Sequence, residues 1–228
     1  FILRGTFSIE LFGAILLAIY FCPKYGLGKG IWFSIFHSIS AFCNAGFDLM
    51  GTAEPFSSLT AQVGNWYVNL IIMSLIVVGG LGFFVWRDIL NTRLHFTKMQ
   101  LHTKLVLTVT AFLIISGSVL LFLFEHGTAS FEGLTLSEQI AASSFQSVSA
   151  RTAGFNTIDL AALTESGRFL IIILMFIGAS PGSTAGGIKT TTFAVLALSV
   201  VTTFRSRKSA EVFGRRLEEM ITRKATCI

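Results

Sequence analysis

The sequence contains few cysteines and few charged residues. The three cysteines, Cys22, Cys43 and Cys227, have no Cys-x-x-Cys spacing and no neighbouring histidine cluster, and their odd number argues against a self-contained disulfide framework. Neither a zinc site nor a redox site is therefore indicated. Charged residues make up only 13% of the chain, and no cluster of His, Cys or carboxylates lies within its apolar segments. An enzyme has little support from this sequence.

Apolar residues dominate instead. Of 228 residues, 53% are hydrophobic and 23 are Phe, and the mean hydropathy is +0.73. This composition predicts a multi-pass protein of the plasma membrane rather than a soluble domain. The net charge of +5 is explained by membrane topology and does not indicate nucleic-acid binding. The chain begins without Met and stops at Ile228, where an apolar run resumes, so we expect a fragment.

Four segments are long enough, or nearly so, to cross a hydrocarbon core about 30 Å thick. They are Thr6–Phe21, Asn65–Trp86, Leu101–Phe124 and Gly167–Phe204, the last interrupted by SPGSTAGG at 180–187. Two shorter apolar stretches, Ile31–Phe42 and Leu136–Ala150, lie between the first and second spans and between the third and fourth. At about 1.5 Å per residue each is too short to cross, so we expect re-entrant helices. The fold class expected is an all-α integral membrane protein.

The distribution of charge predicts the orientation. The 87–104 connection and the 205–224 segment are strongly basic, whereas 125–165 carries five acidic residues against Arg151. The basic segments should be cytoplasmic and the acidic one should lie outside. Both short helices then begin and end on the outer side. The tail 205–228 is expected to be a basic cytoplasmic segment with some lipid-headgroup contact.

One phrase occurs twice. FHSISA at 36–41 matches FQSVSA at 145–150, and Ala-Gly-Phe at 45–47 matches Ala-Gly-Phe at 153–155, after a length difference of one residue. Each copy lies in a unit of span, short helix, turn and span. The sequence therefore predicts two parallel membrane–pore–membrane repeats, 1–90 and 91–204, related by an axis along the membrane normal.

The repeated turn suggests a selectivity filter. Glycine after a re-entrant helix permits positive φ, so that backbone carbonyls can face a narrow axis and replace the water around a cation such as K⁺. A single Ala-Gly-Phe would be an ordinary helix terminus, but two copies that follow a shared helix sequence favour a filter. The candidate residues are Cys43, Asn44, Ala45, Gly46, Arg151, Thr152, Ala153 and Gly154, with Phe47 and Phe155 packing behind them.

The polar residues of the phrase have simpler interpretations. The matched serines are expected to be small packing residues between helices rather than ion ligands. His37, whose counterpart is Gln146, is expected to be a buried hydrogen-bonding residue. A guanidinium aimed at a cation pathway would repel ions, so Arg151 should turn away and pair with Asp159, Asp48 or loop carbonyls.

The interruption of the fourth span suggests a gate. Its residues, Ser180, Pro181, Gly182, Ser183, Thr184, Ala185, Gly186 and Gly187, leave backbone groups without helical partners at mid-membrane. The alternative is a packing surface of Gly178, Gly182 and Gly186 with a proline kink. Lys189 would either reach the cytoplasmic side or interact with this loop. GGIKT lacks the Gly-Lys-Thr adjacency of a nucleotide-binding P-loop.

Three stretches carry a resemblance to a known family. FHSISAFCNAGF, FQSVSARTAGFNTI and GASPGSTAGGIKTTTF resemble the second and third repeats of the Trk/Ktr/HKT potassium-transporter superfamily, most closely its KtrB-type (TrkG/NtpJ-like) membrane subunits. The resemblance implies four repeats around one pore, with Gly46 and Gly154 as two of four filter glycines and 180–187 as the loop that obstructs permeation at rest. It also implies a homodimer on a ring of RCK-type nucleotide-binding subunits, and no covalent cofactor. With two of four repeats, this chain alone should not close a selective pore.

Two other functions stay open on the sequence. A Na⁺ or Na⁺/K⁺ secondary transporter would also use broken helices, but it would bind its substrate at a midplane site and rock between states. A non-conducting scaffold would tolerate alanine at Gly46 or Gly154. Residue pattern alone does not rank K⁺ above Na⁺.

Overall fold

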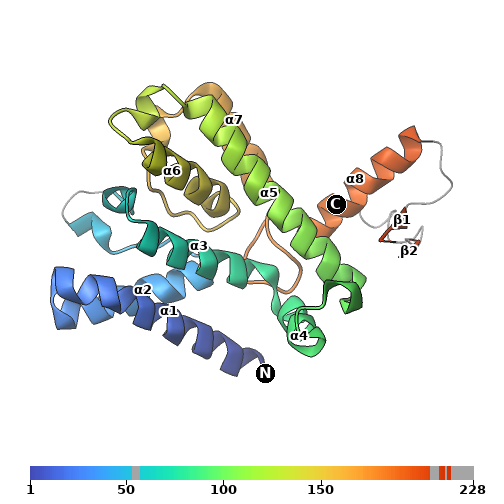
Figure 1. Ribbon diagram of the computed structural model, residues 1–228, viewed down its shortest axis with the longest axis horizontal. Helices are drawn as coiled ribbons and strands as arrows, with labels where there is room; N and C mark the ends of the chain where they lie inside the picture. Colours follow the sequence, from blue (N-terminus) through green and yellow to red (C-terminus); the bar gives the residue numbers. More distant parts are fainter. Residues whose placement is uncertain (53–56, 206–210, 214, 217–228) are drawn as a thin grey trace.

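The computed structural model describes residues 1–52, 57–205, 211–213 and 215–216, whose regular elements are helices and one short hairpin, joined by loops (Figure 1). The hairpin pairs β1 (Glu211–Val212) with β2 (Arg215–Arg216) in antiparallel register. Most of the predicted basic cytoplasmic segment, 205–228, lies outside the described residues.

The first half of the chain is built around a short helix between two longer elements. α1 (Ile2–Tyr25) reverses at Gly26 into α2 (Leu27–Phe42), and η1 (Met50–Thr52) and η2 (Thr60–Gln62) lead into α3 (Trp66–Leu81) and α4 (Phe83–Thr92). Leu17, Phe21, Phe33 and Ile72 from α1, α2 and α3 are buried in one apolar core. These contacts hold α2 between its neighbours, as Figure 1 shows.

The α-helices of the second half follow a similar order, with a long helix, a short helix and two further helices. After η3 (Phe96–Lys98) come α5 (Leu101–Glu125), η4 (Ala129–Phe131), α6 (Leu136–Ser149), η5 (Leu160–Ala162), α7 (Glu165–Phe176) and α8 (Thr190–Phe204). α6 begins with a capping box, in which the Thr135 hydroxyl accepts from the Glu138 N–H and the Glu138 carboxylate accepts from the Thr135 N–H. Leu113, Ala142, Ile171 and Leu174 form the core between α5, α6 and α7.

Among the residues that the structure describes, two helices are individually long and apolar enough to cross a membrane. They are α1, with 24 residues, and α5, with 25 residues. α3 and α4 qualify only together and are bent by 95° at Gly82, so the predicted continuous span Asn65–Trp86 is wrong. The break in the fourth predicted span is wider than expected, because residues 177–189 separate α7 from α8. Large apolar side chains are exposed along α1 and α5, including Phe7, Leu11, Ile15, Phe112 and Ile115, as hydrocarbon surroundings permit.

Candidate functional site

The repeated phrase forms two similar loops. We call residues 43–47, after α2, the first return loop, and residues 151–155, after α6, the second return loop. Positive φ occurs at matching places in both, at Asn44 (51°) and Gly46 (71°) in the first and at Thr152 (72°) and Gly154 (94°) in the second. This alternation produces neither helix nor strand. The two loops therefore share a backbone conformation as well as a sequence.

The carbonyl oxygens of these loops are free. No described residue donates a hydrogen bond to the carbonyl oxygens of 43–46 or 151–154, whereas the preceding carbonyl of Phe42 and the following carbonyls of Phe47 and Phe155 all accept one. A backbone carbonyl that has no protein donor is left to bind water or a ligand. Each return loop therefore has four consecutive carbonyl oxygens that are available to a ligand.

The matched serines hold the loops in place. Ser40 Oγ donates to the Phe47 carbonyl at 2.7 Å, and Ser149 Oγ donates to the Phe155 carbonyl at 2.5 Å. Each hydroxyl ties the far end of a return loop to the helix that precedes it. The serines therefore bind protein carbonyls, as expected for residues that are not ion ligands.

The other matched pair fixes each short helix to a long one. Ser38 Oγ donates to the Glu10 carbonyl of α1 at 2.7 Å, and Ser147 Oγ donates to the Ile114 carbonyl of α5 at 2.9 Å. Close approach requires glycine on the long helix, because a Cβ added to Gly13 would lie 2.6 Å from Ser38 Oγ. Gly117 has the same relation to Ser147.

The two return loops meet at their glycines. A Cβ added to Gly46 would collide with the Ala153 carbonyl oxygen and would lie 3.0 Å from Gly154 Cα. A Cβ added to Gly154 would have one close neighbour, Gly46 Cα, at 3.5 Å. Behind the second loop Phe155 is fully buried, as predicted, but Phe47 is 70% exposed. The expectation for Phe47 is therefore wrong for the described chain, because no described element covers its ring.

We call residues 177–189 the crossing loop, because it passes between other elements of the fold. Ser180 N–H donates to the Gly80 carbonyl at 3.1 Å, the Ser180 hydroxyl donates to the Leu81 carbonyl, and Phe83 N–H donates to the Gly182 carbonyl at 3.0 Å. These bonds pair backbone groups that a continuous α3–α4 helix would have paired internally. The crossing loop therefore stabilises the break at Gly82.

The crossing loop also contacts both return loops. Thr184 Oγ1 donates to the Phe42 carbonyl at 2.9 Å and accepts from Asn44 Nδ2 at 2.9 Å. Gly186 N–H donates to Thr152 Oγ1 at 3.2 Å. The loop thus binds the residues with positive φ that precede the two glycines.

The structure tests the packing alternative for this segment. α7 ends at Phe176, so Gly178, Gly182 and Gly186 lie on no helix, and a Cβ on Gly178 would clash with the backbone at 186–187 of the same loop. A helix-packing surface is therefore excluded. Lys189 Nζ donates to the Ala185 carbonyl at 2.8 Å, so this side chain interacts with the loop.

His37 and Arg151 are both buried but have different surroundings. His37 Nδ1 lies 2.7 Å from the Phe33 carbonyl and Nε2 accepts from Leu49 N–H at 3.3 Å, which gives the hydrogen-bonding role expected. Arg151 pairs with neither predicted aspartate. Asp48 Oδ1 accepts from Met50 N–H and Asp159 Oδ1 from Ala161 N–H, so both carboxylates bind backbone in their own turns.

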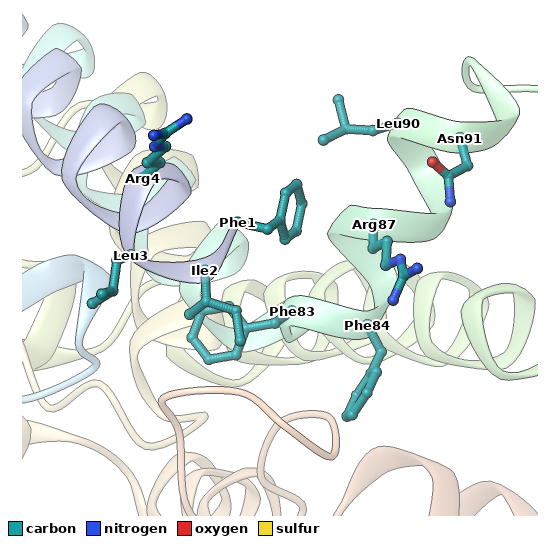
Figure 2. Close-up of a pocket in the computed structure, with 9 residues that line it drawn as sticks. All are labelled: Phe1, Ile2, Leu3, Arg4, Phe83, Phe84, Arg87, Leu90 and Asn91. Atoms are coloured by element: carbon teal, nitrogen blue, oxygen red, sulfur yellow. The ribbon is translucent and has the colours of Figure 1, made fainter.

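Two carboxylates were missed, one partly buried and one fully buried. Glu10 lies within α1, and its Oε1 is 3.9 Å from Cys43 Sγ of the first return loop. Glu125, counted among the outer charges, is fully buried and accepts from Ser130 Oγ and Thr164 Oγ1 at 2.6 Å each. An acidic residue inside an apolar run was the available signal for Glu10. A pocket of about 800 Å³ lies between the start of α1 and α4 and contains none of the predicted site residues (Figure 2).

Known proteins are similar to this chain in sequence and in fold. The TrkH family, described as cation transport protein, matches residues 2–225. The chain is 42% identical over 225 residues to the potassium/sodium uptake protein NtpJ of Enterococcus hirae, covering 99% of this chain and 49% of that protein. It is 40% identical over 224 residues to Ktr system potassium uptake protein B of Bacillus subtilis, covering 98% and 49%.

A solved structure gives the same result for the fold. The crystal structure of the potassium transporter TrkH from Vibrio parahaemolyticus superposes with a TM-score of 0.75 at 21% identity, over 98% of this chain and 47% of that one. The chain spans about half the length of the curated relatives it matches. The predicted helical membrane fold and the predicted family are confirmed, and the family consists of transporters rather than enzymes. This chain belongs to the TrkH family of cation transport proteins.

Proposed function

We propose that this chain forms part of the pore of a K⁺ uptake protein, in which dehydrated K⁺ passes along the backbone carbonyls of Cys43 to Gly46 and Arg151 to Gly154. The observation that carries the proposal is the run of free carbonyls in both return loops, with hydrogen-bonded carbonyls on either side. A rigidly held row of unpaired carbonyl oxygens can replace the hydration shell of a cation.

The helices supply further electrostatic support. α2 and α6 both end directly at a return loop, so the partially negative C-terminus of each helix lies beside the proposed ion path. This field favours a cation without an ionised side chain as ligand. NtpJ is named as a potassium/sodium uptake protein, so Na⁺ is the competing ion to test.

The crossing loop is proposed as the gate, with residues 180–187 as its movable part. Its bonds to Phe42, Asn44 and Thr152 support a position against the proposed ion path. They are few and include no salt bridge among the described residues. A small number of neutral hydrogen bonds suits a segment that must move away when the pore conducts.

The larger assembly follows from the proposed pore. The chain supplies two membrane–pore–membrane repeats, 1–90 and 91–204, and a closed filter of four strands requires two more. We propose a homodimer of complete membrane subunits in the bilayer, with the basic segment 205–228 facing an RCK-type nucleotide-binding regulatory subunit. A secondary transporter with the same broken helices is the competing function, and saturable, ion-coupled flux would favour it.

The test replaces a glycine whose backbone carries a proposed ligand. Gly154→Ser in the full-length subunit with its regulatory partner is compared with Gly133→Ser, in a cell deficient in K⁺ transport, under separate K⁺ and Na⁺ loads. Gly133 also has positive φ (75°), but a Cβ there meets nothing within 4 Å. The control therefore reproduces the backbone strain outside the return loops.

The proposal expects Gly154→Ser to weaken K⁺ uptake or to let Na⁺ compete, while Gly133→Ser transports as the wild type does. Equal K⁺ and Na⁺ fluxes in wild type and Gly154→Ser, at equal amounts of protein in the membrane, would reject the filter.

A further inference from the structure

Two buried side chains of the return loops each have a polar atom without a hydrogen-bond partner among the described residues. Asn44 is 8% exposed and its Oδ1 has no partner among the described residues. Arg151 is 6% exposed and its Nε is likewise unpaired within the described part of the chain. A buried acceptor or a buried charged donor left in this state costs about 1–3 kcal/mol or more. Both atoms therefore require a partner.

The surroundings of Asn44 fix which way its amide faces. Thr184 Oγ1 uses its proton to donate to the Phe42 carbonyl, so it can only accept from Asn44. The Asn44 nitrogen also lies 3.4 Å from that carbonyl, where an oxygen would be repelled. The amide NH₂ must face the crossing loop, and Oδ1 must face the other way.

Asn44 and Arg151 line the same internal cavity. Its volume is about 10 Å³, and its other walls come from Ile76, Val77 and Gly80 of α3, Val148 of α6 and Ala179. That space is close to the minimum for one water molecule. The walls contain no other polar side chain, so an acceptor from the first return loop and a donor from the second are the side-chain partners available there.

We propose that one buried water bridges Asn44 Oδ1 and Arg151 Nε and so joins the two return loops. The water donates one hydrogen to Oδ1 and accepts from Nε–H, which satisfies both atoms. Arg151 then acts as a positioning residue. Through the water it fixes Asn44 Oδ1, and this keeps the Asn44 NH₂ directed at Thr184. The second return loop is thus linked through the first return loop to the crossing loop. This role deepens the proposed function, but the water site itself does not require it.

The direct test is a high-resolution density map of the purified full-length protein. A water peak within hydrogen-bond distance of both Asn44 Oδ1 and Arg151 Nε is expected. A map with no peak between these atoms, or with the guanidinium bound to another acceptor, would overturn the proposal. The map is informative even if Gly154→Ser leaves uptake unchanged, so failure of the bridge and failure of the filter are distinguishable.

A double-mutant cycle tests the coupling. Arg151→Met removes the donor, and Asn44→Gly removes the acceptor while keeping a residue that tolerates positive φ. The melting temperature of the double variant should fall by less than the sum of the two single losses. The difference from that sum should be about 2–4 °C. Arg151→Met combined with Ser183→Ala should be additive, because Ser183 lies outside the cavity and its hydroxyl donates within the crossing loop.

Asn44→Asp separates positioning from packing. Aspartate tolerates the same backbone conformation and can still accept from the water, but it has no NH₂ for Thr184. Its melting temperature should depend on Arg151 at least as strongly as that of the wild type, because a carboxylate also attracts the guanidinium. Its K⁺ uptake should differ from wild type in the same direction as that of Thr184→Val. Additive losses in the Asn44→Gly cycle, or an Asn44→Asp variant that no longer responds to Arg151→Met, would contradict the bridge.

Discussion

At the scale of single residues, the two matched glycines are not equivalent. Gly46 faces the Ala153 carbonyl and the Gly154 backbone at close range, whereas Gly154 has one neighbour at van der Waals distance. Both have positive φ, so any side chain costs about 1–2 kcal/mol of backbone strain at either position. Only at Gly46 is a steric clash added to that strain.

We therefore expect Gly46→Ala to reduce K⁺ uptake and melting temperature more than Gly154→Ala. Gly133→Ala serves as control, because it carries the strain without any neighbour within 4 Å. K⁺ uptake in the K⁺-transport-deficient cell and thermal unfolding of the purified protein measure the loss in each of the three variants. Equal losses in Gly46→Ala and Gly154→Ala would show that the two loops do not meet as described.

At the scale of elements, three hydrogen bonds join the crossing loop to the return loops and the Phe42 carbonyl that precedes the first of them. Thr184 is its main link to the first return loop, through one donated and one accepted hydrogen bond. Thr184→Val keeps the shape and removes both bonds, at a cost of about 1–3 kcal/mol. If the loop obstructs the pore at rest, K⁺ flux without activation should rise.

Resting flux in proteoliposomes measures this effect. Ser183→Ala is the matched control, because its hydroxyl donates to Ser180 within the loop and not to a return loop. A resting flux in Thr184→Val that is no higher than in Ser183→Ala would argue against a gate at this position.

The start of α6 gives a prediction for pH. Hydrogen bonds from the Thr135 backbone N–H, and then from its hydroxyl, lower the pKa of the Glu138 carboxyl. Because the folded-state pKa lies below the ordinary value of 4.5, the stabilisation is present above that value and is lost as the pH falls through the folded-state pKa. The melting temperature of the wild type should therefore fall more between about pH 6 and pH 3 than that of Glu138→Gln. Parallel pH profiles would mean that the capping box does not form.

Parts of the fold depend on tertiary contacts that a sequence pattern does not reveal. The repeated phrase, the short helices and the non-helical segment near 180–187 were all visible in the sequence. The break at Gly82 was not, because Gly79, Gly80 and Gly82 lower the helix propensity of this apolar run without fixing where the helix ends. It becomes a break because Ser180, 99 residues away from Leu81, supplies a hydrogen bond there. The sequence could not choose a partner for Arg151, and the two candidate aspartates, Asp48 and Asp159, bind backbone N–H groups in their own turns.

At the scale of the whole molecule, charge predicts which side faces the cytoplasm. Lys98 lies in the basic connection and Glu132 in the acidic one, and both are exposed. Single cysteines at these positions, in a background with Cys22, Cys43 and Cys227 changed to Ser, test the orientation. A membrane-impermeant thiol reagent should label Glu132→Cys in intact cells, and Lys98→Cys only after the cells are opened. The reverse pattern would invert the proposed topology.

The link between Asn44 and Thr184 has a consequence for biosynthesis. These residues are 140 positions apart in the chain. At about 5–20 residues per second, Thr184 is translated on the order of ten seconds after Asn44. During that interval the nascent first return loop has no hydroxyl for the Phe42 carbonyl and no acceptor for the Asn44 amide. The insertion machinery must keep both groups hydrated or covered until the last span arrives, so the first half of this chain completes its structure only after the second half has been made.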